Sequence, residues 1–324
     1  MLLSFAAVAV GLVLLVWSAD RFILGSAGLA RAAGISPLVV GMVIVGFGTS
    51  APELAVSTLA ALQGSSGIAI GNVVGSNIAN VALIVGLCAV IKAMDVQSGI
   101  LRRELPMVLA VSLLLFVLLL DGSLDRIDGL VLSAGFIAFL VWSIRTAKRD
   151  GSDPMAVEAV EELPPQIATG PALMWIVIGL AVLIGASQLL VWGAVNLAKA
   201  AGVSDLIIGL TVVAIGTSLP ELAASVTGTL KGEHDIAIGN ILGSNLFNIL
   251  CILIAPALIA PGALPDAMLL WRDLPVMIGV ALMLYAAASG LRGHPLKVER
   301  IDGVLLLAVY VSYTLILVQT AKTA

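Results

Sequence analysis

The chain of 324 residues is 60% hydrophobic and only 11% charged, with a formal net charge of -4 at pH 7. Because a soluble domain carries about 25% charged residues, this composition excludes a soluble protein and indicates an integral membrane protein. No basic tract is present for nucleic acid, and Cys88 and Cys251 lack the spacing of a zinc site or a disulfide framework.

Apolar stretches long enough for a membrane helix, about 20 residues, follow one another along the chain. The first lacks the basic start and the cleavage pattern of a signal peptide, so we expect it to be retained. The sequence therefore predicts an all-α, polytopic membrane protein. Its ten predicted membrane helices are residues 2–28, 36–62, 68–91, 104–120, 127–144, 171–197, 205–230, 236–258, 274–290 and 303–320.

The loops between these helices carry most of the charges and predict the orientation. Most of the 16 Lys and Arg residues fall in alternate loops, for example Arg102, Arg103 and Lys148. Basic residues accumulate in cytoplasmic loops, so we expect a multi-pass protein of the cell (inner) membrane with both termini outside. The longest connection, residues 146–170, is acidic and contains prolines, which predicts a cytoplasmic linker.

Two motifs occur twice, once on each side of the linker. GTSAPEL at 48–54 recurs as GTSLPEL at 216–222. GNVVGSNIAN at 71–80 recurs as GNILGSNLFN at 239–248, at the same offset. Such internal duplication is the first feature to establish in a sequence, because it determines the whole architecture.

The duplication extends over nearly the whole chain, since RIDG at 126–129 recurs at 300–303. We therefore divide the chain into a first repeat of five helices, residues 1–145, and a second repeat of five helices, residues 171–324. Because five is an odd number, the second repeat must enter the membrane from the opposite side. Two inverted repeats with a site between them near the membrane midplane are typical of secondary transporters.

The first motif places an acidic residue, Glu53 or Glu221, inside each apolar stretch. A carboxylate at the membrane centre costs about 2.5–3.5 kcal/mol or more, so two at equivalent positions predict a bound cation. Pro52 and Pro220 precede them and disrupt the helix, which frees backbone carbonyl groups. Further oxygen atoms come from neighbouring hydroxyl groups: Thr49, Ser50, Thr217 and Ser218.

The second motif adds hydroxyl and amide groups spaced four residues apart, on one helical face. These candidate ligands are Ser76, Asn80, Ser244 and Asn248. Gly71 and Gly75 are instead predicted to serve helix packing. A site made only of oxygen atoms suits hard cations such as Ca²⁺ and Na⁺, whereas transition metals prefer His or Cys.

The two copies, residues 46–80 and 214–248, resemble the alpha-repeats of the sodium/calcium exchangers in the cation/calcium exchanger superfamily. The resemblance implies ten helices, with the second, third, seventh and eighth around a shared site and the first and sixth sliding across it. It also implies the cation ligands by position, with the carbonyl groups of Gly46 and Ala214 among them. The implied ligands are Gly46, Thr49, Ser50, Glu53, Ser76, Asn80, Ala214, Thr217, Ser218, Glu221, Ser244 and Asn248.

Among these ligands, Glu53, Glu221, Asn80 and Asn248 are the expected Ca²⁺ ligands. Some exchangers of this type carry Asp in place of Asn248, and others carry Asn. With Asn the site has only two carboxylates, which leaves the coupling ion open. We expect no calcium-sensing module of the kind found in the large regulatory domains of animal exchangers. We expect no resident cofactor and no protein partner.

The sequence thus predicts an antiporter that exchanges Ca²⁺ for Na⁺ by alternating access, and not an enzyme. A calcium/proton or potassium-dependent antiporter with the same glutamates is the main alternative, because buried carboxylates can take up protons. An intramembrane enzyme with a glutamate base is a remote alternative, since no His, Cys or metal triad accompanies the glutamates. A passive channel would not need inverted halves.

Overall fold

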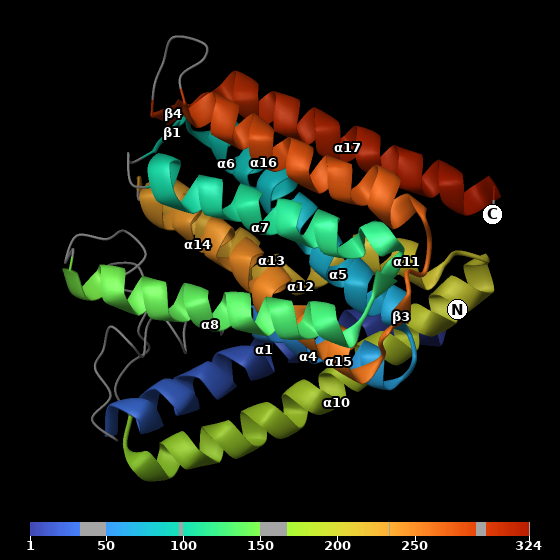
Figure 1. The fold of residues 1–324 in the computed structure, drawn as a ribbon. Coiled ribbons are helices and arrows are strands. Elements are labelled where there is room, and N and C mark those ends of the chain that lie inside the picture. The colour runs from blue at the N-terminus through green and yellow to red at the C-terminus, as the bar shows by residue number, and fades with distance from the viewer. Residues whose placement is uncertain (33–49, 97–99, 150–166, 233, 290–295, 324) are drawn as a thin grey trace.

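Long helices that run side by side make up most of the protein (Figure 1). Eight described helices are long and apolar enough to cross a membrane, and a bent pair of helices makes a ninth. Only the end of the predicted 36–62 helix is described, as the shorter apolar helix Ala51–Leu62. The predicted all-α membrane fold is confirmed. The computed structural model describes residues 1–32, 50–96, 100–149, 167–232, 234–289 and 296–323.

Several predicted membrane helices are interrupted by π-helical or 3-10 segments, labelled η. The elements of the first repeat are α1 (Leu2–Ala32), α4 (Ala51–Leu62), α5 (Ser66–Ile78), η2 (Ala79–Val85), α6 (Gly86–Ile91), β1 (Met94–Asp95), η3 (Ile100–Glu104), α7 (Leu105–Leu118), η4 (Leu119–Asp121), β2 (Ser123–Leu124) and α8 (Arg126–Arg149). The elements of the second repeat are α10 (Thr169–Ala201), α11 (Asp205–Ile208), η5 (Gly209–Val213), α12 (Ala214–Thr217), α13 (Leu219–Lys231), α14 (His234–Phe247), η6 (Asn248–Ile252), α15 (Ile254–Ile259), β3 (Gly262–Ala263), η7 (Leu269–Asp273), α16 (Leu274–Ala288), β4 (Lys297–Val298) and α17 (Arg300–Thr323).

The predicted linker, residues 146–170, lies mostly outside the described residues. Its two ends belong to helices, because α8 continues to Arg149 and α10 begins at Thr169. The division of the chain into two five-helix units therefore stays a prediction at this boundary.

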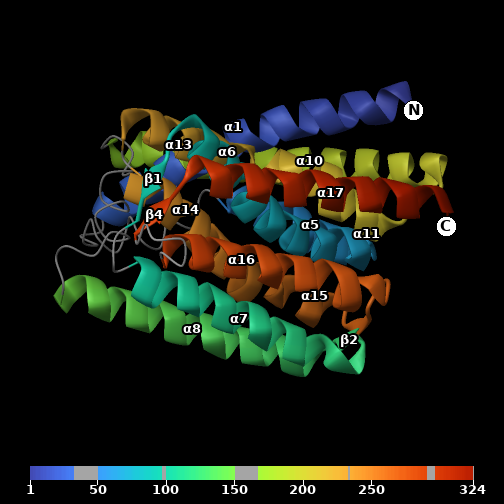
Figure 2. The ribbon, with the colours of Figure 1, turned by 90° about the horizontal axis from the view of Figure 1, so that it is seen from above.

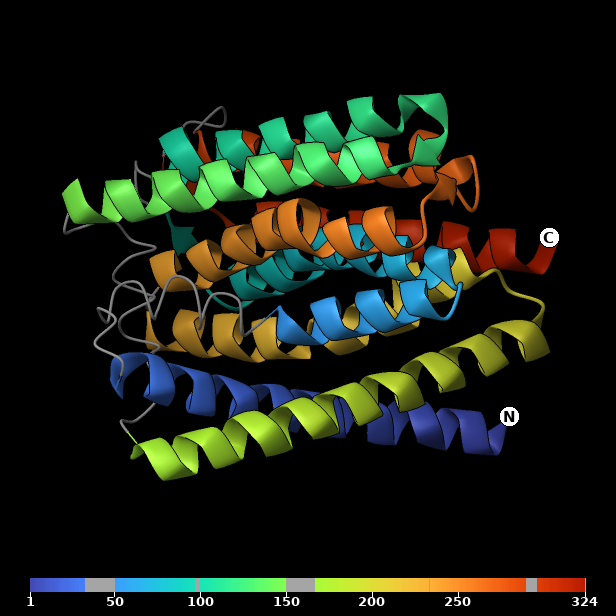
Figure 3. The ribbon, with the colours of Figure 1, turned by 60° about the horizontal axis from the view of Figure 1, so that its bottom comes forward.

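Helices α1 and α10, the first of each repeat, lie side by side and run in opposite directions (Figure 3). Their contacts show the antiparallel order. A Cβ added to Gly11 would lie 3.1 Å from the backbone nitrogen of Leu190, and one added to Gly25 would lie 2.6 Å from the carbonyl oxygen of Ala172. Equivalent helices that cross the bundle in opposite directions are what an inverted repeat requires.

Two short antiparallel strand pairs show the same inversion. β1 pairs with β4, and β2 pairs with β3. By the sequence repeats, β3 is the equivalent of β1 and β4 is the equivalent of β2, so each pair joins the two repeats. The two pairs lie at opposite ends of the bundle, and both chain termini lie at the end that holds β2 and β3 (Figures 1 and 2).

The third and eighth membrane helices form the centre of the bundle. In Ser66–Ile91 and Ala237–Ile259, 78% and 72% of the apolar stretch is buried, against 28% to 44% in the other long spans. The other spans surround them and leave apolar side chains exposed for lipid. The centre therefore holds the second motif of both repeats, residues 71–80 and 239–248.

Candidate functional site

The buried glutamates both lie at the start of a described helix, and a helix break precedes the second one. Helix α12 ends at Thr217, and α13 turns away from it by 44°. Pro52 and Pro220 lie in the first turn of α4 and α13, where the missing N–H needs no helical partner. The break predicted beside Glu221 is confirmed. Glu53 and Glu221 thus lie in the first turn of a helix, where backbone N–H groups favour negative charge.

The carboxyl groups of Glu53 and Glu221 lie together at the centre of the protein. Both residues are 0% exposed, and they are close enough to repel each other electrostatically. Ser218 Oγ donates a hydrogen bond of 3.2 Å to Glu53 Oε1, and Ser244 Oγ donates one of 3.2 Å to Glu221 Oε1. Glu53 therefore takes its serine from the opposite repeat. Two buried carboxylates that repel each other need cations or protons to neutralise them.

The other predicted ligands in the described part of the chain are also buried. Gly46 and Thr49 lie outside the described residues. The carbonyl oxygen of Ala214 accepts a hydrogen bond of 3.4 Å from Ser76 Oγ, so a hydroxyl group occupies it in this conformation. The buried candidates are Ser50, Ser76, Asn80, Ala214, Thr217, Ser218, Ser244 and Asn248.

Several buried oxygen atoms in this region have no hydrogen-bond partner among the described residues. A buried acceptor left unpaired costs about 1–3 kcal/mol, and a cation would satisfy several of them at once. Carboxylate, amide and hydroxyl oxygen atoms are also the ligands that Ca²⁺ and Na⁺ take. The unpaired atoms are Ser50 Oγ, Glu53 Oε2, Asn80 Oδ1 and Asn248 Oδ1.

Asn72 supports the start of α4, a role that the sequence did not predict. Its Nδ2 donates to Ser57 Oγ at 2.9 Å and to the carbonyl oxygen of Glu53 at 3.3 Å. Its Oδ1 accepts a hydrogen bond of 3.0 Å from Thr217 Oγ1. Ser57 follows Glu53 by one helical turn and recurs at Ser225. This repetition is the sequence signal that could have indicated a supporting contact beside each glutamate. Asn72 thus holds the glutamate-bearing turn and the Thr217 hydroxyl in one arrangement.

The two central helices are joined by asparagine side chains. Asn80 Nδ2 donates to Asn245 Oδ1 at 3.0 Å, and Asn248 Nδ2 donates to Asn77 Oδ1 at 2.9 Å. Each candidate ligand also lies at a π-helical segment, Asn80 in η2 and Asn248 at the start of η6. π-helical turns often mark functional sites, because the extra residue per turn reorients side chains.

The glycines of the second motif serve close helix packing, as predicted. A Cβ added to Gly71 would lie 2.6 Å from the carbonyl oxygen of Leu206. One added to Gly75 would lie 2.7 Å from both Cα and the carbonyl oxygen of Leu210. Helix α5 therefore packs directly against the backbone of the helix that ends beside Glu221.

No basic side chain is buried with the glutamates in the part of the chain that the structure describes, since none of the described Lys and Arg residues is buried. The buried His234 accepts a hydrogen bond of 3.2 Å from the backbone N–H of Asp95 in β1. The described residues also contain no group of three or more His, Cys, Asp and Glu that could hold a metal ion. A cation at this site would complete its shell with amide and hydroxyl oxygen atoms.

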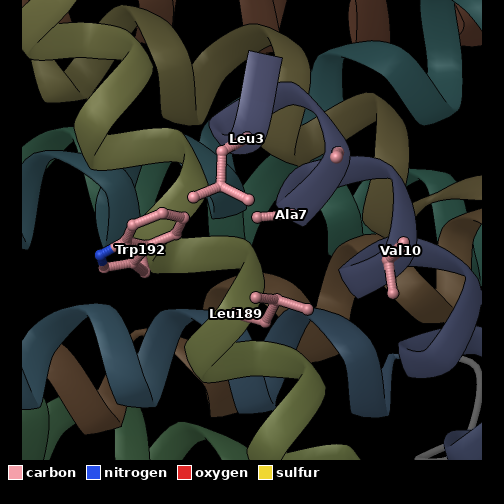
Figure 4. Close-up of a pocket in the computed structure, with 6 residues that line it drawn as sticks. Leu3, Ala7, Val10, Leu189 and Trp192 are labelled. Carbon is pink, nitrogen blue, oxygen red and sulfur yellow. The ribbon is translucent and has the colours of Figure 1, made fainter. Parts of the chain in front are cut away.

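A separate hollow of about 470 Å³ lies between α1 and α10 (Figure 4). Trp192 is 44% exposed at its edge. Because its lining is apolar, this hollow offers no ligand for a cation. The residues that line it are Leu3, Ala6, Ala7, Val10, Leu189 and Trp192.

Comparison with known proteins gives consistent matches over nearly the full length. The family model for "Sodium/calcium exchanger protein" matches residues 3–145 and 171–319. The chain is 47% identical to "Putative antiporter CaxA" of Alkalimonas amylolytica, over 98% of this chain and 99% of that protein. It is 44% identical to "Inner membrane protein YrbG" of Escherichia coli, over 87% and 88%. A solved structure of the sodium-calcium exchanger NCX_Mj, soaked with Na⁺ and Sr²⁺, matches with a TM-score of 0.61 and 31% identity, over 96% of this chain and 97% of that one.

Proposed function

The chain is a membrane antiporter of the sodium/calcium exchanger family, and on this premise we propose that it exchanges Ca²⁺ for Na⁺ by alternating access. One observation carries the proposal. Glu53 and Glu221 come from equivalent positions of two inverted repeats and meet as a buried pair among oxygen ligands. Their two charges match one Ca²⁺, and a family of transporters gives no reason to expect an enzyme.

The ligands for the transported ions would come from both repeats. Ca²⁺ would bind Glu53 and Glu221 together with the amide oxygen atoms of Asn80 and Asn248, which supports a shell of the kind that Ca²⁺ prefers. Na⁺ would use smaller groups of the same oxygen atoms, with hydroxyl and carbonyl groups beside them. The hydroxyl and carbonyl ligands would be Gly46, Thr49, Ser50, Ser76, Ala214, Thr217, Ser218 and Ser244.

Alternating access would follow from the inverted architecture. The break beside Glu221, with the equivalent break expected beside Glu53, would let each half expose the shared site toward one side of the membrane. The antiparallel pair α1 and α10 lies on one side of this core and touches α4 and α12, so a shift of the pair would alternately cover the two entrances. Neutralisation of the carboxylates by Ca²⁺ or by Na⁺ would be required before either shift, because an empty, charged site is costly in a low-dielectric barrier.

Sodium is the coupling ion that the hydroxyl groups around each glutamate favour, since protons would need only the two carboxylates. A calcium/proton exchange with the same glutamates, or a potassium-dependent exchange, is the alternative.

For the location, the relative from Escherichia coli that is named an inner membrane protein supports the inner membrane, and the distribution of basic residues supports termini on the outer side.

The coupling ion is tested by uptake of ⁴⁵Ca²⁺ into proteoliposomes under imposed Na⁺, K⁺ or H⁺ gradients. We expect an outward Na⁺ gradient to drive uptake, with Glu221→Gln proteoliposomes at the level of protein-free vesicles. Uptake driven by a pH gradient in sodium-free medium, with no response to Na⁺, would overturn sodium coupling and leave the site intact. No exchange under any gradient would reject calcium transport.

A further inference from the structure

Two buried asparagines outside the predicted ligand set join the central helices of the two repeats. Asn77 and Asn245 are each 2% exposed. Asn77 Nδ2 donates to the carbonyl oxygen of Asn245 at 3.3 Å, and Asn245 Nδ2 donates to the carbonyl oxygen of Asn77 at 3.4 Å. We propose that they are positioning residues, each of which fixes the amide of the candidate ligand on the opposite helix so that its oxygen atom is available to the cation.

The direction of every amide in this network follows from the two backbone carbonyl groups. A carbonyl oxygen can only accept, so the nitrogen ends of Asn77 and Asn245 must face the backbone. Their Oδ1 atoms then face the other way and accept from Asn248 Nδ2 and Asn80 Nδ2. Asn80 Oδ1 and Asn248 Oδ1 remain as the free ends, without a hydrogen-bond partner among the described residues.

An amide needs such a device and a carboxylate does not. The NH₂ end of an asparagine repels a cation, while either oxygen of an aspartate can bind one. An asparagine ligand free to rotate would spend part of its time with the wrong end toward the ion. Asn77 acts on Asn248 and Asn245 acts on Asn80, so each ligand is oriented by the repeat to which it does not belong.

This inference rests on the proposed function, and its test separates positioning from mere helix packing. Asn77→Ala and Asn245→Ala each remove one of the two reciprocal bonds to backbone, so each is the matched control of the other. The measurement is the KM for Ca²⁺ in ⁴⁵Ca²⁺ exchange by proteoliposomes, in the native background and in the Asn248→Asp and Asn80→Asp backgrounds.

We expect Asn77→Ala to raise the KM about three- to tenfold in the native background, the effect of one net hydrogen bond. In the Asn248→Asp background the rise should fall below about twofold, because a carboxylate has no wrong end. In the Asn80→Asp background the full rise should remain. Asn245→Ala should show the reverse pattern, with suppression by Asn80→Asp alone.

Equal KM increases in all backgrounds would reduce both asparagines to a packing role and overturn the proposal. No saturable ⁴⁵Ca²⁺ exchange by the wild type would instead show that the proposed function has failed, and the positioning role with it. If Asn77→Ala is not monodisperse, Asn77→Ser serves in its place, since it also lacks the amide group. Its KM increase should again be suppressed in the Asn248→Asp background alone, and an increase of equal size in all backgrounds would contradict the role.

Discussion

The hydroxyl group of Thr217 distinguishes the two candidate coupling ions, and Thr217→Val removes it at almost unchanged volume. Thr217 is 0% exposed, and its Oγ1 donates to Asn72 Oδ1 at 3.0 Å. The substitution leaves that buried acceptor unpaired, which costs about 1–3 kcal/mol of folding stability. It also deprives a bound Na⁺ of one oxygen ligand.

The expected weakening of Na⁺ binding follows from the loss of one oxygen ligand. A bond between a neutral group and a charge is worth about 1.5–3 kcal/mol, so losing one should weaken Na⁺ binding roughly ten- to hundredfold at about 1.4 kcal/mol per factor of ten. We expect Na⁺-driven release of ⁴⁵Ca²⁺ from loaded proteoliposomes to fall at least about tenfold at subsaturating Na⁺. Proton-driven release needs only the carboxylates of Glu53 and Glu221. It should change by less than about threefold, because the lost hydroxyl group affects it only through one neutral hydrogen bond.

Thr229→Val is the matched control. Thr229 is also 0% exposed, and its Oγ1 donates to the carbonyl oxygen of Ser225 at 2.8 Å within the same helix. The control removes a buried hydroxyl group from the glutamate-bearing helix and should keep sodium-driven release. Equal Na⁺ dependence in the two variants would refute the assignment of Thr217 as a sodium ligand.

Three further predictions concern the site, the topology and the packing. Glu53→Gln and Glu221→Gln should each abolish ⁴⁵Ca²⁺ exchange in monodisperse protein, because each removes a charge that balances Ca²⁺, and near-normal exchange by either would reject the site. Glu161→Cys in a cysteine-free background should resist an impermeant thiol reagent in intact cells, since the linker is expected in the cytoplasm. Gly75→Ala should lower the Tm, because its Cβ would lie 2.7 Å from the facing backbone, whereas Gly170→Ala, with nothing within 4 Å, should not lower the Tm.

The sequence could predict the helices and the inversion because both leave periodic, duplicated signals. A membrane helix needs a long apolar stretch whatever its partners, and the recurrence of the motifs located equivalent positions before any contact was known. The start of α13 beside Pro220 was likewise predictable from the chemistry of proline. The short strand pairs were not predicted, since two-residue strands such as Met94–Asp95 carry no alternating pattern.

The parts of the site that escaped prediction depend on contacts between the repeats. Asn72 and Asn77 were visible in the duplicated motif, but nothing in the sequence says that Asn77 pairs with Asn248, or that Asn72 accepts from Thr217. Spacing within one helix shows which residues share a face. It does not show which residue of another helix lies opposite, and here the orienting partners come from the other repeat.

The two halves of the site are equivalent in sequence but differ in their serine hydrogen bonds, and this difference predicts the opposite-facing state. Ser218 donates to Glu53, whereas its equivalent Ser50 has an Oγ without a partner among the described residues. Ser244 donates to Glu221, whereas Ser76 donates to the Ala214 carbonyl. In inverted repeats the second state arises when the halves exchange conformations. We therefore expect Ser50 to donate to Glu221, and Ser76 to Glu53, in a structure open to the other side. Retention of the Ser218–Glu53 bond in both states would show that the serines do not take part in the exchange.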